Sequence, residues 1–146
     1  MDFMIDKDKL QELNDVISLY KKFDKYSAYT KEELFYDLLP SFQLMQYKTI
    51  KEDDKVIGFA NWALLSKAAE EKYKQTASLD HDDWQSGLRV WLIDIVAIKD
   101  TKKIMKWIIN YFKKFLIVGE RINWLRIDEG FNVYRQSFKE KRSFHR

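Results

Sequence analysis

The sequence predicts a mixed α/β fold in which helices cover both faces of one central sheet. Helix-like and strand-like segments alternate along the 146 residues, a length that suits one domain with a single core. The strongest strand pattern, LRVWLIDIVAI at 88–98, is apolar on both faces, which is typical of a strand at the centre of a covered sheet. Glycine and proline number only 4 and 1, and no linker or repeat is visible. We therefore expect one domain over residues 1–146.

Two helices are expected before the first strand. Residues 7–23 repeat apolar side chains at helical spacing and form the first helix. The second, at 30–45, begins with TKEE, a capping box in which Thr30 caps the helix and Glu33 reaches back to it. Pro40 is expected to end or kink this helix, because proline lacks the N–H that a helix interior needs.

The later part of the chain supplies two more helices and five strands. A helix is expected at 66–76, with Ser66 as its N-cap, and another at 100–116, capped by Asp100 or Thr101. Apolar and β-rich runs predict strands at 46–52, 55–65, 88–98, 122–129 and 131–139. The order of these elements fits a mixed, mostly antiparallel sheet.

The composition excludes several classes of protein. There is no cysteine, which excludes disulfides, thiolate metal sites and a cysteine nucleophile. His81 and His145 are the only histidines, so we expect no metal site, and His81, in the acidic loop DHDD, is expected to be simply exposed. The N-terminus is acidic and no apolar run reaches the roughly 18 residues of a spanning helix. We therefore expect a cytoplasmic protein without stable membrane insertion.

Charge is distributed unevenly along the chain. Residues 1–98 carry 13 basic and 18 acidic side chains, whereas residues 99–146 carry 13 basic and 5 acidic ones. The basic part indicates a negatively charged partner, such as an acidic carrier protein, a nucleic acid or an anionic membrane, or else a solvated face. Aromatic and basic residues interleave over 102–115, but the aromatics share one helix face, which favours core packing. We therefore expect no nucleic-acid partner.

Asp94 is the most informative single residue, because it interrupts the otherwise uncharged run WLIDIVAI. A buried carboxylate is costly unless it is paired or its pKa rises. Either outcome suits a general base or an orienting group. The alternative is a structural aspartate that accepts hydrogen bonds from backbone N–H groups at a strand irregularity.

The strand-to-helix junction AIKDTKK at 97–103 is a second candidate site. A helix N-terminus presents free N–H groups and a positive dipole end, and Lys99, Lys102 and Lys103 add charge. This combination favours phosphate binding. The alternative is that these lysines only decorate the start of a helix.

Two segments resemble a known family. GFANWALLSKAAEEKY (58–73) and DDWQSGLRVWLIDIVA (82–97) are similar to the toxin-activating lysine acyltransferases, which attach fatty acyl chains to internal lysines of RTX protoxins. With flanking matches at 34–50 and 122–128, the resemblance covers roughly residues 34–128. The positions that match together are Trp62, Leu65, Ser66, Tyr73, Trp84, Ser86, Gly87, Arg89, Trp91, Ile93, Asp94 and Ala97.

The resemblance implies a fold like that of the Gcn5-related N-acetyltransferases (GNAT), which the order of elements also fits. It implies an acyl carrier protein as donor, with the acyl group held as a phosphopantetheine thioester, and a lysine ε-amine of a protein or peptide as acceptor. Acyl-coenzyme A stays open as the donor. No permanently bound cofactor is expected, and a homodimer is an open alternative to a monomer.

The resemblance also implies roles for particular residues. The family's catalytic aspartate falls on Asp94. Its catalytic histidine would fall near Ser27, but no histidine occurs in residues 1–80, so we expect Tyr26, Ser27 or Tyr29 to occupy that space. The acyl donor is expected along the strand at 88–98. The residues expected to contact donor or acceptor are Asn61, Trp62, Arg89, Trp91, Ile95, Val96, Ala97, Lys99, Lys102 and Lys103.

The chain also departs from the family. Leu88 stands in place of an acid, Ile95 in place of a tryptophan, and Ile98 and Lys99 in place of the start of a proline-phenylalanine-glycine run. The missing histidine favours one alternative, an inactive GNAT-like module that binds an acyl carrier or a peptide. The retained Asp94 and Arg89 favour an active enzyme. An acetyl-coenzyme A dependent enzyme would carry a glycine-rich phosphate loop, which AIKDTKK lacks.

Overall fold

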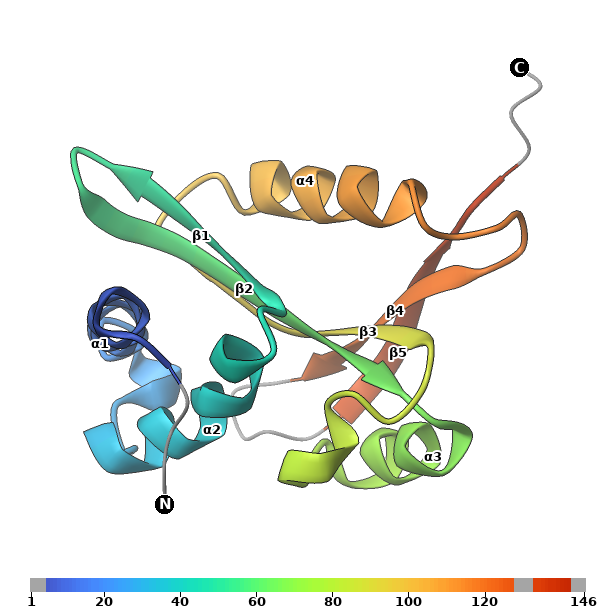
Figure 1. Ribbon diagram of the computed structural model, residues 1–146, viewed down its shortest axis with the longest axis horizontal. Coiled ribbons are helices and arrows are strands. Elements are labelled where there is room, and N and C mark those ends of the chain that lie inside the picture. Colours follow the sequence, from blue (N-terminus) through green and yellow to red (C-terminus); the bar gives the residue numbers. More distant parts are fainter. Residues whose placement is uncertain (1–4, 128–132, 143–146) are drawn as a thin grey trace.

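The computed structural model describes residues 5–127 and 133–142, and these form one mixed α/β unit (Figure 1). The helices are α1 (Lys7–Tyr20), α2 (Lys31–Gln43), α3 (Lys67–Thr76) and α4 (Thr101–Lys113), with short 3-10 helices η1 (Asp24–Tyr26) and η2 (His81–Asp83). The strands are β1 (Tyr47–Glu52), β2 (Lys55–Leu65), β3 (Arg89–Ala97), β4 (Arg121–Ile127) and β5 (Val133–Glu140). The predicted order of helices and strands is confirmed. Residues 128–132, at the ends of the last two predicted strands, lie outside the described part.

The five strands form one sheet in the order β1-β2-β3-β4-β5. All neighbours pair antiparallel except β3 and β4, which are parallel and joined through α4. A parallel pair needs such a crossover, because its strands run in the same direction. The predicted mixed, mostly antiparallel sheet is therefore confirmed, with β3 at its centre.

Helices cover both faces of this sheet, as predicted. Figure 1 shows α1, α2 and α3 on one face and α4 alone on the other. Apolar side chains of α1 and α2 pack against Phe59 and Val96, and α3 packs against Trp91. On the opposite face, Ile104 and Ile108 of α4 contribute to a separate apolar cluster. Three clusters thus hold four helices on one sheet, and burial of their apolar surface is the main stabilising contribution.

The helix starts follow the predicted capping chemistry at two positions out of three. Thr30 and Glu33 form the capping box of α2, and Ser66 accepts a hydrogen bond from the Ala69 N–H at the start of α3. At α4, the prediction that the side chain of Asp100 or Thr101 caps the helix is wrong. Asp100 occupies the N-cap position in a left-handed conformation (φ 63°), and its side chain makes no capping hydrogen bond.

The predicted effect of Pro40 is also wrong in part, because α2 continues past it to Gln43. A proline so near a helix end removes only one backbone hydrogen bond. The next turn closes through the Leu44 N–H, which donates to the Pro40 carbonyl. The buried side chains of Leu39 and Phe42 then hold this turn against the core.

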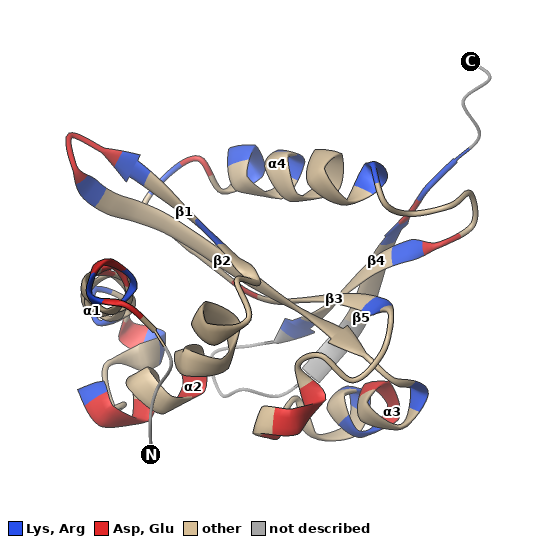
Figure 2. Cartoon of the chain, viewed as in Figure 1, with Lys and Arg blue, Asp and Glu red and all other residues tan. Residues whose placement is uncertain are grey.

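The uneven charge of the sequence is visible in space. Figure 2 shows lysines at both ends of α4, whereas α2 and η2 carry acidic residues on the opposite face of the sheet. Within the described residues, no helix is long and apolar enough to cross a membrane.

Candidate active site

The site is built on an irregularity in the central strand. Asn61 of β2 pairs with Asp94 of β3, but the next residue, Trp62, pairs with Leu92. Ile93 is therefore an extra residue on β3, which makes this point a β-bulge. Bulges of this kind re-aim side chains and are common beside active sites.

The bulge changes the face on which each β3 side chain lies. Before it, Leu92 contacts the α4 cluster while Trp91 and Ile93 contact the α3 cluster. After it, Ile95 contacts the α4 cluster. In a regular strand Asp94 would follow Leu92 onto the α4 side, because alternate residues share a face. Instead, Asp94 joins Ile93 in lining a cleft on the opposite, three-helix face.

Asp94 is held by two side chains from different elements. The Tyr20 hydroxyl of α1 donates a 2.6 Å hydrogen bond to Asp94 Oδ2, and the Asp94 N–H donates to Asn61 Oδ1 at 2.9 Å. The buried Asn61 is itself fixed, since its Nδ2 donates to Ser41 Oγ of α2. Burial raises the pKa of the Asp94 carboxyl above its ordinary value, and the Tyr20 hydrogen bond and the positive charge of Lys25 partly offset this rise.

Two hollows meet at this carboxyl. The larger cleft, of about 400 Å³, lies between η1 and α2 on one side and α3 and η2 on the other. The smaller cavity, of about 190 Å³, is lined by β3 and by Trp124 and Leu125 of β4. The residues that line both are Lys25, Tyr26, Ile93 and Asp94. Asp94 can therefore contact one molecule in the larger cleft and another in the smaller cavity.

The smaller cavity lies where the sheet divides. The parallel register between β3 and β4 runs from Val90–Ile122 to Leu92–Trp124 and ends there. Asp94 donates its N–H to Asn61 of β2, and Ile98 donates to Ile57 of β2. Because N–H groups alternate between the two edges of a strand, those of Ile95 and Ala97 point to the edge that β4 has left. This edge offers hydrogen-bond donors to an extended ligand.

Tyrosines surround the Asp94 carboxyl. Tyr26 and Tyr29 both line the larger cleft, and the Tyr26 ring packs edge-on against Tyr20 with centroids 4.7 Å apart. Burial and then the charge of Asp94 raise the pKa of Tyr26, so its hydroxyl stays protonated at neutral pH. Ser27 is exposed and donates its hydroxyl to the Asp24 carbonyl, outside the lining of both hollows.

Several other predicted site residues lie on the sheet around Asp94. Asn61 and Ile95 line the larger cleft and the smaller cavity, respectively. Trp62 and Ala97 belong to the α4 cluster, and Val96 is buried against α1 and α2. These three side chains therefore support the site from within the core.

Two further predicted residues join β3 to α3. Trp91 is fully buried and donates its indole N–H to Glu70 at 2.7 Å. Arg89 forms an ion pair with the same carboxylate at 3.4 Å. Neither side chain lines the larger cleft or the smaller cavity among the described residues.

The three predicted lysines lie beyond β3. Lys99 pairs with Glu52 of the β1–β2 hairpin at 2.9 Å. Lys102 and Lys103 are exposed in the first turn of α4. They leave a positively charged surface at that end of the helix, outside the lining of the two hollows.

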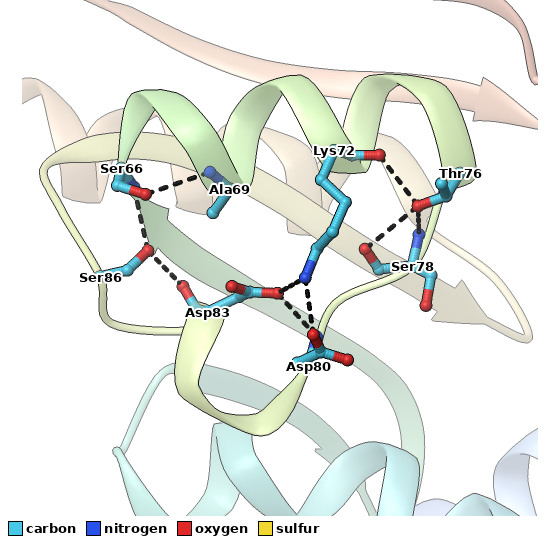
Figure 3. A network of polar contacts seen from close by, with 8 residues as sticks. All are labelled: Ser66, Ala69, Lys72, Thr76, Ser78, Asp80, Asp83 and Ser86. Atoms are coloured by element: carbon cyan, nitrogen blue, oxygen red, sulfur yellow. Dashed lines mark hydrogen bonds and ion pairs between the residues drawn. The ribbon is translucent and has the colours of Figure 1, made fainter.

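Several residues of the larger cleft, including Lys25, Asp37 and His81, were not expected there. His81, at the start of η2, lines the wall opposite Tyr26 and Tyr29. It is exposed, as the sequence predicts, but no local pattern shows that η2 folds back against α3. Figure 3 shows the reason: Lys72 of α3 forms ion pairs with Asp80 and Asp83, which flank His81.

Hydrogen bonds fix the rest of this wall. Ser86 accepts from the Ser66 N–H at 3.0 Å and donates to the Asp83 carbonyl at 2.8 Å (Figure 3). Burial alone would raise the pKa of Asp83, but its hydrogen bonds to Lys72 and to the Asp80 N–H hold that pKa below the ordinary value. The wall is therefore a pre-formed part of the cleft.

A bulged central strand, a sheet that divides beside it and a helix that follows define a GNAT-like fold. A solved structure agrees: the loading GNATL domain of CurA from Lyngbya majuscula matches with a TM-score of 0.57 at 12% identity. The match covers 81% of this chain and 61% of that one. At such low identity it shows the fold alone, and the predicted fold class is confirmed.

A match to a family model assigns the chain more narrowly than its fold does. The model of the RTX toxin acyltransferase family matches residues 5–135, and the chain belongs to this family. The resemblance found in the sequence is therefore confirmed.

Named relatives agree with this assignment. The chain is 31% identical over 91 residues to the protein-lysine myristoyltransferase RtxC of Kingella kingae, a match that covers 62% of this chain and 54% of the relative. It is 34% identical over 86 residues to the leukotoxin-activating lysine-acyltransferase LktC of a Pasteurella haemolytica-like strain, covering 58% and 52%. With the RTX-I toxin-activating lysine-acyltransferase ApxIC of Actinobacillus pleuropneumoniae, 32% identity extends over 113 residues, covering 76% and 66%. The chain thus spans about half the length of the first relatives it matches.

Proposed function

We propose that this chain transfers a fatty acyl group from a thioester donor to the ε-amine of a lysine in a protein or peptide. The observation that carries the proposal is the position of Asp94, a residue that lines both the larger cleft and the smaller cavity. An acyl transfer needs two substrates that meet at one proton-accepting group. Relatives named as lysine acyltransferases support the reaction class.

The donor fits the smaller cavity. An acyl thioester on a phosphopantetheine arm is extended and carries amide groups, which suit the free edge of β3 with its Ile95 and Ala97 N–H groups. One such N–H can stabilise the oxyanion that forms when the thioester carbonyl is attacked. Lys102 and Lys103 in the first turn of α4 offer charge to the phosphate of the donor. We take an acyl carrier protein as the donor, with acyl-coenzyme A as the alternative.

The acceptor fits the larger cleft. Asp37 of α2 and Asp94 both line it, and burial followed by the charge of Asp94 raises the pKa of Asp37. Such a carboxyl-lined cleft suits the cationic side chain of a lysine. An acceptor lysine that enters here reaches Asp94 from the side opposite to the donor.

These positions also give the route of the proton that the acceptor lysine must lose. A lysine with an ordinary pKa near 10.4 is mostly charged at neutral pH and must lose a proton before it attacks. Asp94 accepts that proton, and its raised pKa makes it a stronger base than an exposed carboxylate. The amine then forms an amide bond to the acyl carbon while the carbon–sulfur bond breaks. The second proton of the amine passes to the departing thiolate, so the products are an amide and a free thiol.

The competing function is a module that binds carrier or peptide without turnover. It is favoured by the absence of histidine from residues 1–80, where the family has one. Asp94 favours catalysis instead, because its pKa is raised and it lines both the larger cleft and the smaller cavity.

The test is the intact mass of a lysine-containing segment of an RTX protoxin, incubated with the full chain and an acyl carrier protein loaded with tetradecanoate. We expect the peptide to gain one acyl group. Asp94→Asn should lower the rate about 10²- to 10⁴-fold, the usual range for loss of a general base. Asp24→Asn, which changes an exposed carboxylate in η1, is the matched control and should leave the rate unchanged. A full rate in Asp94→Asn would refute the role of Asp94.

A further inference from the structure

We propose that Lys25 is a self-acylation site: when no acceptor is present, the chain transfers the acyl group of its donor to the Lys25 ε-amine. The inference rests on the proposed function, because it uses the same donor and the same base. It adds a modified residue within this chain and a built-in competitor for the acceptor.

The position of Lys25 carries the inference. It lies in the middle of η1 and lines both the larger cleft and the smaller cavity, beside Asp94 and Tyr26. Its Nζ lies 5.6 Å from the centre of the Tyr26 ring. Of the described residues that line either hollow, Lys25 alone carries a primary amine. An acceptor lysine and Lys25 would thus present the same nucleophile to the same thioester.

Charge and proximity favour the reaction. The positive charge of Lys25 is near enough to Asp94 to pull the pKa of that carboxyl downwards against the effect of burial. Because Lys25 and Asp94 line the same two hollows, the carboxylate can take a proton from this ammonium through a bridging water. A group held beside a reactive thioester reacts as though its concentration were far above that of any dissolved amine.

The atoms and charges balance without a further reactant. The Lys25 ammonium gives one proton to Asp94, and the neutral amine attacks the thioester carbonyl. The carbon–sulfur bond breaks as the amide carbon–nitrogen bond forms. The second amine proton goes to the departing thiolate, so the products are an amide, a free thiol and one proton released from Asp94 to solvent.

The consequence for the enzyme is self-limitation. An amide on Lys25 is stable and neutral, and its acyl chain would occupy the hollows that the donor and the acceptor need. Chain that meets a donor without an acceptor should therefore become modified once and then lose activity towards an acceptor added later.

The test uses the full chain and tetradecanoyl acyl carrier protein without acceptor, followed by intact mass and peptide mapping. The chain should gain one acyl group at Lys25, and the group should resist alkaline hydroxylamine, which cleaves esters on Tyr26 or Ser27 but not amides. Lys25→Arg keeps the charge, yet arginine stays protonated and does not acylate, so it should gain none. Lys22→Arg, an exposed position in the same segment, should react like the unaltered chain.

Each outcome decides between the two proposals. If the protoxin peptide is acylated while Lys25 stays unmodified, self-acylation is refuted and the proposed function stands. If the acyl group is found on another residue, or survives in Lys25→Arg, the assignment to Lys25 is wrong. If neither the chain nor the peptide gains an acyl group, the proposed function fails and this inference fails with it.

Discussion

The Asp94 carboxyl is governed by neighbours with opposing effects. Burial raises its pKa, while the Tyr20 hydroxyl and the charge of Lys25 lower it. The balance leaves a carboxyl that is more basic than an exposed one but is still held in place by a 2.6 Å hydrogen bond. A base that is both activated and oriented is what proton removal from an amine needs.

The contribution of Tyr20 can be measured with Tyr20→Phe. Loss of its hydrogen bond should raise the pKa of Asp94 further, so the carboxylate becomes protonated at a higher pH. The acid limb of the kcat/KM profile should therefore move to higher pH, and unfolding in urea should show a loss of roughly 1.5–3 kcal/mol, typical of a hydrogen bond to a charged group.

Tyr47→Phe is the control, because the Tyr47 hydroxyl donates to Glu12 and neither residue lines the larger cleft or the smaller cavity. It should cost stability without moving the acid limb. An acid limb that stays in place in Tyr20→Phe would show that Asp94 is not the titrating base.

Sequence patterns locate Asp94 but not the side chains around it. A lone charge within WLIDIVAI stands out because an apolar strand excludes charges. In contrast, which of Tyr26 and Ser27 lies beside Asp94 depends on the turn of η1, which places Tyr26 in the lining of the smaller cavity and leaves Ser27 in solvent. A three-residue helix has no periodicity from which this choice could be read.

Helices and most strands are predictable because their apolar periods are unbroken. The bulge in β3 could not be predicted, because both faces of this strand are apolar. A side chain that changes face therefore does not alter the pattern of apolar residues in the sequence. The continuation of α2 past Pro40 escapes prediction for a related reason: tertiary packing of Leu39 and Phe42 overrides a local propensity.

Packing between β2, α3 and the loop before β3 gives a prediction at Gly87. A Cβ there would lie 2.5 Å from the Leu65 carbonyl oxygen and 2.6 Å from the Ser66 nitrogen, both backbone atoms that cannot rotate away. We expect Gly87→Ala to lower the free energy of unfolding by about 3 kcal/mol, measured by urea denaturation.

Gly58→Ala is the matched comparison for that substitution. The closest contact of its Cβ would be the end of the Ile104 side chain, also at 2.5 Å, and this side chain can rearrange. A loss of about 1 kcal/mol is expected. Equal losses in both variants would contradict the claim that backbone contact at Gly87 sets the cost.

At the scale of the whole molecule, two separate hollows meet at Asp94. The helical face supplies a cleft with carboxyl groups, whereas the divided sheet supplies a cavity lined by residues of β3 and β4. The basic start of α4 follows β3 in the chain. Figure 2 shows the same separation, with acidic residues around α2 and η2 and lysines on α4. The proposed function therefore predicts that a cationic acceptor and an anionic carrier are drawn to different surfaces.

This separation predicts the effect of reversing charge on α4. Lys102→Glu with Lys103→Glu, at the start of the helix, should weaken binding of the acyl carrier protein at least tenfold at low salt and less at high salt. The measurement is affinity titration of the carrier over a range of ionic strength.

Lys113→Glu with Lys114→Glu changes the other end of the same helix by the same charge and should leave the affinity nearly unchanged. Equal weakening by both pairs would mean that net charge, rather than the start of α4, attracts the carrier.

The extra residue Ile93 shifts the alternation of β3 side chains between the two faces of the sheet by one residue. One residue deleted or inserted between Arg89 and Asp94 would point the Asp94 carboxylate into the apolar cluster that contains Ile104 and Ile108, while the backbone could remain a strand. The same change after Ala97 would leave the carboxylate where it is. The number of residues between Arg89 and Asp94 therefore constrains this chain more strictly than which apolar side chains fill the interval.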